Sequence, residues 1–122
     1  MKSSLAAFIC LQAAFCLASS SSIAATRYPF DGSWNIVFMT RQGSCDPSYN
    51  FTVNIFHGIV SHPNLRKFRG SVAGNGAVRA SVTAGDKVAS GSGRLSGSSG
   101  SGRWAGYSGQ ARCSGVWSAS RN

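Results

Sequence analysis

Apolar and polar side chains alternate along most of the chain after residue 32, which is the period of a β-strand with one buried and one exposed face. A tandem repeat shows this most clearly: Gly-Ser-Gly-Arg-Leu-Ser-Gly begins at Gly91 and Gly-Ser-Gly-Arg-Trp-Ala-Gly begins at Gly100. In each copy glycine and the large apolar residue share one face, while serine and arginine share the other. No stretch after residue 26 has helical periodicity. The pattern predicts an all-β antiparallel meander of about eight strands.

The expected strands end at residues that favour turns, chiefly glycine, proline, asparagine and aspartate. They cover residues 33–40, 49–56, 59–62, 65–72, 77–84, 88–95, 102–109 and 113–120. Residues 25–30 have no periodic pattern and are expected to form a mobile lead-in. Two-residue hairpin turns are expected at His57-Gly58, Gly85-Asp86, Ser98-Ser99 and Gln110-Ala111.

These turns bring inward residues opposite inward residues. Val82 falls opposite Ala89. Trp104 falls between Gly93 on one side and Trp117 on the other, so large rings oppose glycine across part of the sheet. Such an arrangement suits a small closed or nearly closed barrel filled by side chains of unequal size. Pairing the first strand antiparallel with the last would close the barrel, and a β-sandwich is the alternative.

Each of the three tryptophans, Trp34, Trp104 and Trp117, follows a glycine by two residues, and closure of the barrel would gather them along its seam. Burying three indoles would stabilise the fold by several kcal/mol, at about 25 cal/mol per Å² of apolar surface. We interpret them as core residues that either fill the lumen or line a cavity. A platform that stacks a ligand is the alternative.

The N-terminal residues have the order of a secretory signal peptide. A basic start at Lys2 precedes an apolar run over residues 5–18, and small residues follow at Ala24 and Ala25. The apolar run is too short for a typical membrane span. We therefore expect a signal peptide over residues 1–25 and a single secreted or periplasmic domain over 26–122, with no transmembrane segment in the mature chain.

Four cysteines are present, and Cys10 and Cys16 lie inside the expected signal peptide. The remaining pair is Cys45 and Cys113. In an exported chain an even number of cysteines predicts a disulfide. Closing the barrel would bring the loop after Thr40 towards the start of the last strand, and so Cys45 towards Cys113.

The chain is strongly basic, with a formal net charge of +9 at pH 7 and three acidic residues, Asp31, Asp46 and Asp86. Such a surface favours polyanions, among them acidic polysaccharide, lipopolysaccharide phosphate, anionic lipid headgroups and nucleic acid. The alternative is that the charge only keeps an exported protein in solution.

The expected register gathers cations on the outer face. Arg94 would lie opposite Arg103, and Arg79 would lie diagonal to Arg94. Like charges facing one another across a sheet repel, and no acidic residue alternates with them, so we hypothesise an anion-binding face. A solvated basic surface whose repulsion is screened by salt is the alternative. The hypothesised polyanion-binding face, rimmed by Ser81, Ser90 and Ser92, consists of Lys67, Arg69, Arg79, Arg94 and Arg103.

Motifs for catalysis or metal binding are sparse. There is no Gly-x-Ser-x-Gly elbow, and His57 and His62 have no carboxylate nearby in the sequence. The glycine repeat lacks the Gly-Lys-Ser/Thr ending of a phosphate-binding loop. We therefore expect no catalytic residue, no metal site and no cofactor.

Several segments resemble a small exported β-domain found in hypothetical proteins of rhizobia-like alphaproteobacteria. They are residues 30–34 (Phe-Asp-Gly-Ser-Trp), 45–47 (Cys-Asp-Pro), the repeat over 91–106, and 113–121 (Cys-Ser-Gly-Val-Trp-Ser-Ala-Ser-Arg). The resemblance supports export and the disulfide, and it implies no role for any residue. In general shape the expected barrel is similar to avidin-like and lipocalin-like meanders.

The leading expectation is an exported, non-enzymatic monomer that binds an anionic glycan, lipid headgroup or other polyanion, without specific recognition of nucleic acid. A second reading is a protein-binding module, such as an inhibitor of a secreted enzyme, that acts through loops at residues 41–48 and 62–66. An unrecognised hydrolase is the third.

Overall fold

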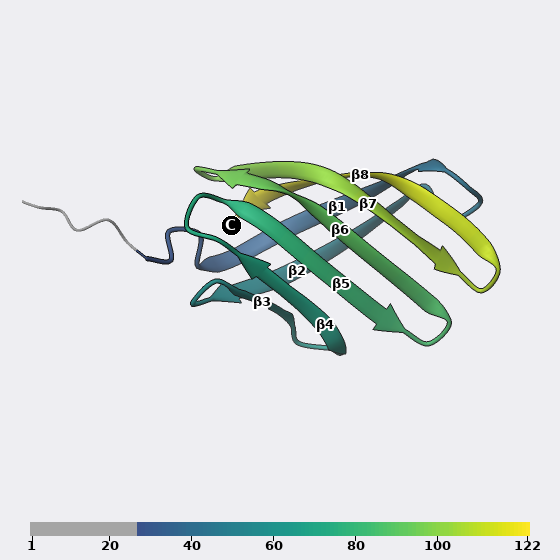
Figure 1. Ribbon diagram of the computed structural model, residues 1–122, viewed down its shortest axis with the longest axis horizontal. Helices are drawn as coiled ribbons and strands as arrows, with labels where there is room; N and C mark the ends of the chain where they lie inside the picture. Colours follow the sequence, from purple (N-terminus) through teal and green to yellow (C-terminus); the bar gives the residue numbers. More distant parts are fainter. Residues whose placement is uncertain (1–26) are drawn as a thin grey trace, which may run out of the picture.

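The computed structural model describes residues 27–122, which form a closed antiparallel barrel of eight strands in sequence order. The first strand pairs with the last, so the barrel is confirmed over the sandwich (Figure 1). The strands are β1 (Gly32–Gln42), β2 (Ser48–Phe56), β3 (Ile59–His62), β4 (Leu65–Val72), β5 (Ala77–Ala84), β6 (Lys87–Ser96), β7 (Ser99–Ser108) and β8 (Ala111–Arg121). The expected signal peptide, with Cys10 and Cys16, lies outside the described residues. Residues 27–122 contain no apolar helix of membrane-spanning length.

The two C-terminal hairpin registers differ by two residues from the prediction. Trp104 pairs with Gly91 and Gly115, not with Gly93 and Trp117. The cause is that Gly97 and Gly109, with φ of 62° and 61°, are the first turn residues, a position that type II′ hairpins reserve for glycine. Each turn is therefore centred one residue earlier than predicted. A shift of two keeps every side chain on its predicted face.

The earlier hairpins form as predicted. Val82 pairs with Ala89 across the β5–β6 turn. His57 and Gly58 both have positive φ, 51° and 75°, as a type I′ turn requires.

The barrel interior holds the apolar residues of alternate strand positions. Trp34, Trp104 and Trp117 are buried, and each indole N–H donates to a backbone carbonyl, at 2.8, 3.2 and 3.1 Å respectively. The acceptors are the carbonyls of Phe30, Met39 and Ser92. Together the rings line an internal cavity of only about 60 Å³. They therefore largely fill this part of the lumen.

The lead-in expected to be mobile is docked over residues 27–31. Phe30 packs against Trp34, with ring centroids 6.4 Å apart. The Arg121 guanidinium lies 4.8 Å from the Trp34 ring and donates to the carbonyls of Pro29 and Asp31 at 2.9 and 2.8 Å. The last residues of β8 thereby hold the lead-in across the end of the barrel where the chain also terminates (Figure 1).

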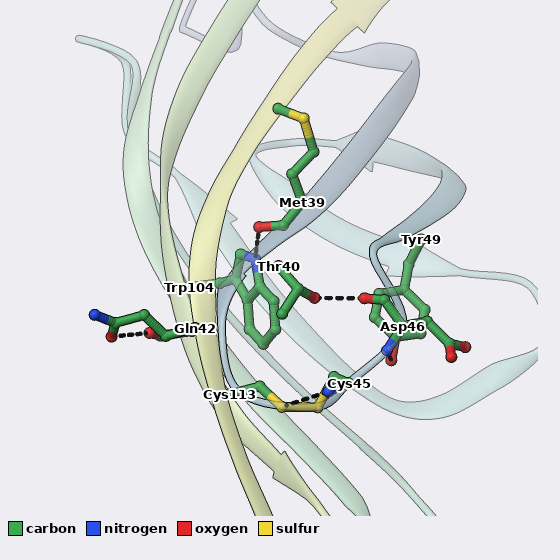
Figure 2. The surroundings of a disulfide bond; sticks show 9 residues. Met39, Thr40, Gln42, Cys45, Asp46, Tyr49, Trp104 and Cys113 are labelled. Carbon is green, nitrogen blue, oxygen red and sulfur yellow. Dashed lines mark hydrogen bonds between the residues drawn. A yellow bond between two sulfur atoms is a disulfide. The ribbon is translucent and has the colours of Figure 1, made fainter.

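A disulfide joins the β1–β2 loop to β8 at the opposite end, between Cys45 and Cys113 as predicted. Figure 2 shows the loop also held by the Tyr49 hydroxyl, which accepts the Asp46 amide hydrogen at 3.1 Å, and by Thr40, which donates to the Asp46 carbonyl. This covalent bond fits an oxidising compartment outside the cytoplasm.

Candidate functional site

The structure places all five hypothesised cationic residues on the outer face of the barrel, and each is exposed. They come from four neighbouring strands: β4 carries Lys67 and Arg69, β5 carries Arg79, β6 carries Arg94 and β7 carries Arg103. Strand alternation alone accounts for this shared face, because every one of them is an odd number of residues from an inward-facing neighbour.

The pairing among them differs from the prediction. Arg94 lies opposite Ser101, and Arg103 lies opposite Ser92 instead of Arg94. Ser92 also pairs with Arg79, so the serine sits between two arginines in one row across three strands. Arg79 and Arg103 are about 10 Å apart at the backbone, two interstrand spacings. The predicted diagonal relation of Arg79 to Arg94 is confirmed.

A broad open groove of about 1,220 Å³ runs over this face. Its floor is hollow because the outward residues at its centre are small, chiefly serine and alanine. Its cationic wall is made of Arg41, Arg69, Arg79 and Arg103, and the three predicted rim serines, Ser81, Ser90 and Ser92, line it as well. Lys67 and Arg94 are on the same face of the sheet but do not line the groove.

The sequence analysis missed Arg41, which it assigned to a loop. β1 continues to Gln42 with a bulge between Thr40 and Gln42, and this puts Arg41 beside β8 at the groove. Extending the outward alternation of Val37 and Met39 by two more residues would have identified it.

The groove has no acidic residue among those that line it. Asp31 is at the β2–β3 hairpin, Asp46 is in the β1–β2 loop, and Asp86 is in the β5–β6 turn. Within residues 27–122 the one ion pair joins Asp86 to Lys87, at 3.8 Å. The groove arginines therefore have no carboxylate to neutralise them, and their positive potentials add over one shallow, open surface.

The centre of the groove is supported from inside the barrel by Trp117. Ser92 presents its side chain to the groove, while its carbonyl accepts the Trp117 indole hydrogen at 3.1 Å. The same tryptophan ring lies against Gly93 and Gly102, which leave space for it. The buried Trp117 ring therefore packs directly beneath the row of Arg79, Ser92 and Arg103.

The two loops of the protein-binding reading lie at one end of the barrel, since β1 and β3 both end there. The first is tied down by the disulfide, and the second is the short turn at Pro63 and Asn64. The two histidines lie at opposite ends: His57 stacks between Tyr28 and Phe56, and His62 packs near Phe51. In the described part of the chain, no three His, Cys, Asp or Glu side chains gather as a metal site would require.

No family model matches the chain, and neither does any curated protein or solved structure. The resemblance drawn from sequence segments therefore stays a prediction. The structure itself describes the molecule as an eight-stranded barrel with a basic groove on its outer face and three buried tryptophans inside.

Proposed function

We propose that this protein is an exported, non-enzymatic domain whose outer groove binds an anionic glycan. Anionic lipid headgroups and other polyanions offer the same charged oxygens. One observation carries the proposal: four arginines from four different strands surround one acid-free depression whose floor carries serine hydroxyls.

The residue types suit sulfate, phosphate or carboxylate groups. Arginine presents a planar fork that can donate two hydrogen bonds to one anionic group. The serines between the arginines add neutral donors that fit the same oxygens. Because the arginines are spread over several strands, an extended chain of repeated anionic groups satisfies more of them than a single small anion does.

The test is binding to heparin, a sulfated polysaccharide, measured by calorimetry over a series of salt concentrations. Replacing Arg79 and Arg103 with serine should weaken binding and lower the slope of log affinity against log salt by about two, one for each lost contact. The matched control replaces Lys67 and Arg94 with serine, which removes the same net charge from the same face outside the groove. That control should have a clearly smaller effect.

Equal losses in the two double variants would show that heparin responds to net charge alone, and the groove would be rejected as the site. A protein partner whose affinity does not change with salt concentration would instead favour the protein-binding module that acts through residues 41–48 and 62–66. Binding through an apolar protein interface is far less sensitive to ionic strength than binding to a polyanion.

A further inference from the structure

A second, apolar pocket opens at the disulfide end of the barrel. It has a volume of about 310 Å³, which falls at the lower end of the range of about 300–1,000 Å³ typical of small-molecule sites. Its walls come from six strands, β1, β2 and β4 to β7, and from the β1–β2 loop, and they include five aromatic rings. They are Phe38, Tyr49 and Phe51 on one side and Trp104 and Tyr107 on the other, with small residues such as Ala84 and Ala89 between them.

The pocket exists because the indoles are unevenly placed along the barrel. Trp34 and Trp117 fill the lumen towards the end where the chain terminates, and Trp104 is the one indole that borders both the internal cavity and this pocket. Beyond Trp104, three of the four inward positions of β5 and β6 carry the small side chains of Val82, Ala84 and Ala89, and the fourth, Lys87, lies at the rim. A void open to solvent therefore remains.

The pocket is held in shape without a ligand. Trp104 is fixed by its hydrogen bond to the Met39 carbonyl and by edge contact with Phe38, with ring centroids 6.0 Å apart. The β1–β2 loop over it is closed by the disulfide and by the Tyr49 hydroxyl (Figure 2). Preformed walls reduce the entropy lost when a ligand binds.

One charged residue lines this pocket, and it is a cation. Lys87 pairs with Ala84 and Ser108 in the row of inward-facing positions at the rim. Its ammonium lies 3.8 Å from the Asp86 carboxylate, but the two side chains are 58% and 71% exposed, so water screens that pair. The lysine stem extends the apolar wall, while its charge stays at the opening.

We propose that this pocket binds a small amphipathic molecule with a hydrocarbon or ring body and an anionic head. The body would lie against Phe38, Phe51 and Trp104, and the head would meet the Lys87 ammonium at the rim. The outer groove is a separate site, because its four arginines lie on the other side of the barrel wall and Trp104 is the one lining residue that it shares with this pocket.

The test uses decanoate as the probe and decanol as its neutral counterpart, with affinity measured by calorimetry and by tryptophan fluorescence. The full domain should bind decanoate at one site. Ala84→Phe places a ring in the pocket and should weaken binding at least about tenfold. Ala73→Phe, the same change in the exposed β4–β5 turn at the other end, should leave binding unchanged.

The head group is tested by Lys87→Met, which keeps the apolar stem. It should remove a preference for decanoate over decanol of about two- to fivefold, whereas Lys67→Met on the outer face should keep that preference. The Arg79 and Arg103 double variant should bind decanoate normally, which separates this site from the proposed glycan groove.

Three results would overturn the proposal. The first is absence of decanoate binding, and the second is binding that Ala84→Phe leaves intact in a variant with an unchanged urea unfolding midpoint. The third is equal affinity for decanoate and decanol, which would reject the anionic head. If Ala84→Phe lowers the unfolding midpoint, Ala84→Leu serves as the milder filling variant and must weaken binding in its place.

Discussion

The Trp117 ring packs against a part of the barrel wall that is made of glycine. A Cβ added at Gly93 would come within 2.6 Å of the ring, and one added at Gly102 would also come within 2.6 Å of it. These two glycines face each other across β6 and β7. Their absent side chains are therefore what allows the indole to pack against the sheet while its N–H reaches the Ser92 carbonyl.

Substituting Gly102 by alanine should destabilise the fold by about 1–3 kcal/mol, the usual cost of overpacking a core. The added methyl group meets both the Trp117 ring and the Ser92 carbonyl, and neither can move without disturbing the other. Urea unfolding followed by tryptophan fluorescence measures the change.

Gly74→Ala is the matched control, because its added Cβ would meet only the Arg27 carbonyl, at 3.8 Å. We expect that variant to stay within about 0.5 kcal/mol of the parent. Equal stability of the Gly102 and Gly74 variants would contradict the role assigned to the glycine patch.

The β2–β3 hairpin depends on a contact from outside its own sequence. The Asp31 carboxylate accepts the backbone N–H groups of His57 and Gly58, at 2.7 and 3.1 Å. Both turn residues have positive φ, and this is unusual for a non-glycine residue such as His57. Tyr28 adds a stacked ring on His57, at 4.8 Å between centroids. The docked lead-in therefore stabilises the turn.

Asp31→Ala should cost about 1–2 kcal/mol of stability, since two hydrogen bonds to a charged acceptor are lost at a partly exposed site. Hydrogen exchange at the His57 and Gly58 amides should become faster, while exchange at the β5–β6 turn should not change.

Asp86→Ala provides the comparison, because the Asp86 carboxylate is 71% exposed and its ion-pair partner is Lys87 at 3.8 Å. An exposed pair of this kind contributes little to stability. If the amides of residues 57 and 58 exchanged equally in the Asp31 and Asp86 variants, the capping role would be rejected.

The sequence pattern predicts the eight strands and most of the turns between them. β3, β4 and β5 have the predicted bounds, because proline, asparagine and glycine mark their ends. The hydrophobic pattern predicts the β6–β7 and β7–β8 turns one residue late, with Ser98 and Gln110 in first position. The first residue of a type II′ turn needs a positive φ, and Gly97 and Gly109 supply it. Turn chemistry, and not hydrophobic pattern, decides between registers that differ by two.

The disulfide acts on the molecule as a whole. It joins residues separated by 68 positions, and for a loop of that length the chain-entropy model gives about 4 kcal/mol of stabilisation through the unfolded state. A domain of this size has a small core and modest total stability. The disulfide therefore supplies a large part of the free energy of unfolding.

Replacing both Cys45 and Cys113 with alanine should lower the unfolding free energy by about 4 kcal/mol. Adding reductant to the parent should lower its urea unfolding midpoint to about that of the double variant, and the midpoint of the double variant should not change with reductant. A parent protein whose midpoint is unchanged by complete reduction would contradict this account.

The sequence by itself determined which face of the sheet each residue occupies. Period-two alternation survives any register shift of two, so the buried tryptophans and the outward position of Lys67, Arg69, Arg79, Arg94 and Arg103 could be deduced without coordinates. The pairing of Cys45 with Cys113 followed from their being the two cysteines outside the expected signal peptide and from barrel closure.

Only the tertiary structure decided which outward residues are neighbours and how much of the lumen is filled. It placed Ser92 between Arg79 and Arg103, brought Arg41 to the groove, and left Lys67 and Arg94 outside it. It also left a pocket beyond Trp104. These features depend on turn geometry, a bulge and the fit of rings from distant strands, and none of those follows from alternation along a single strand.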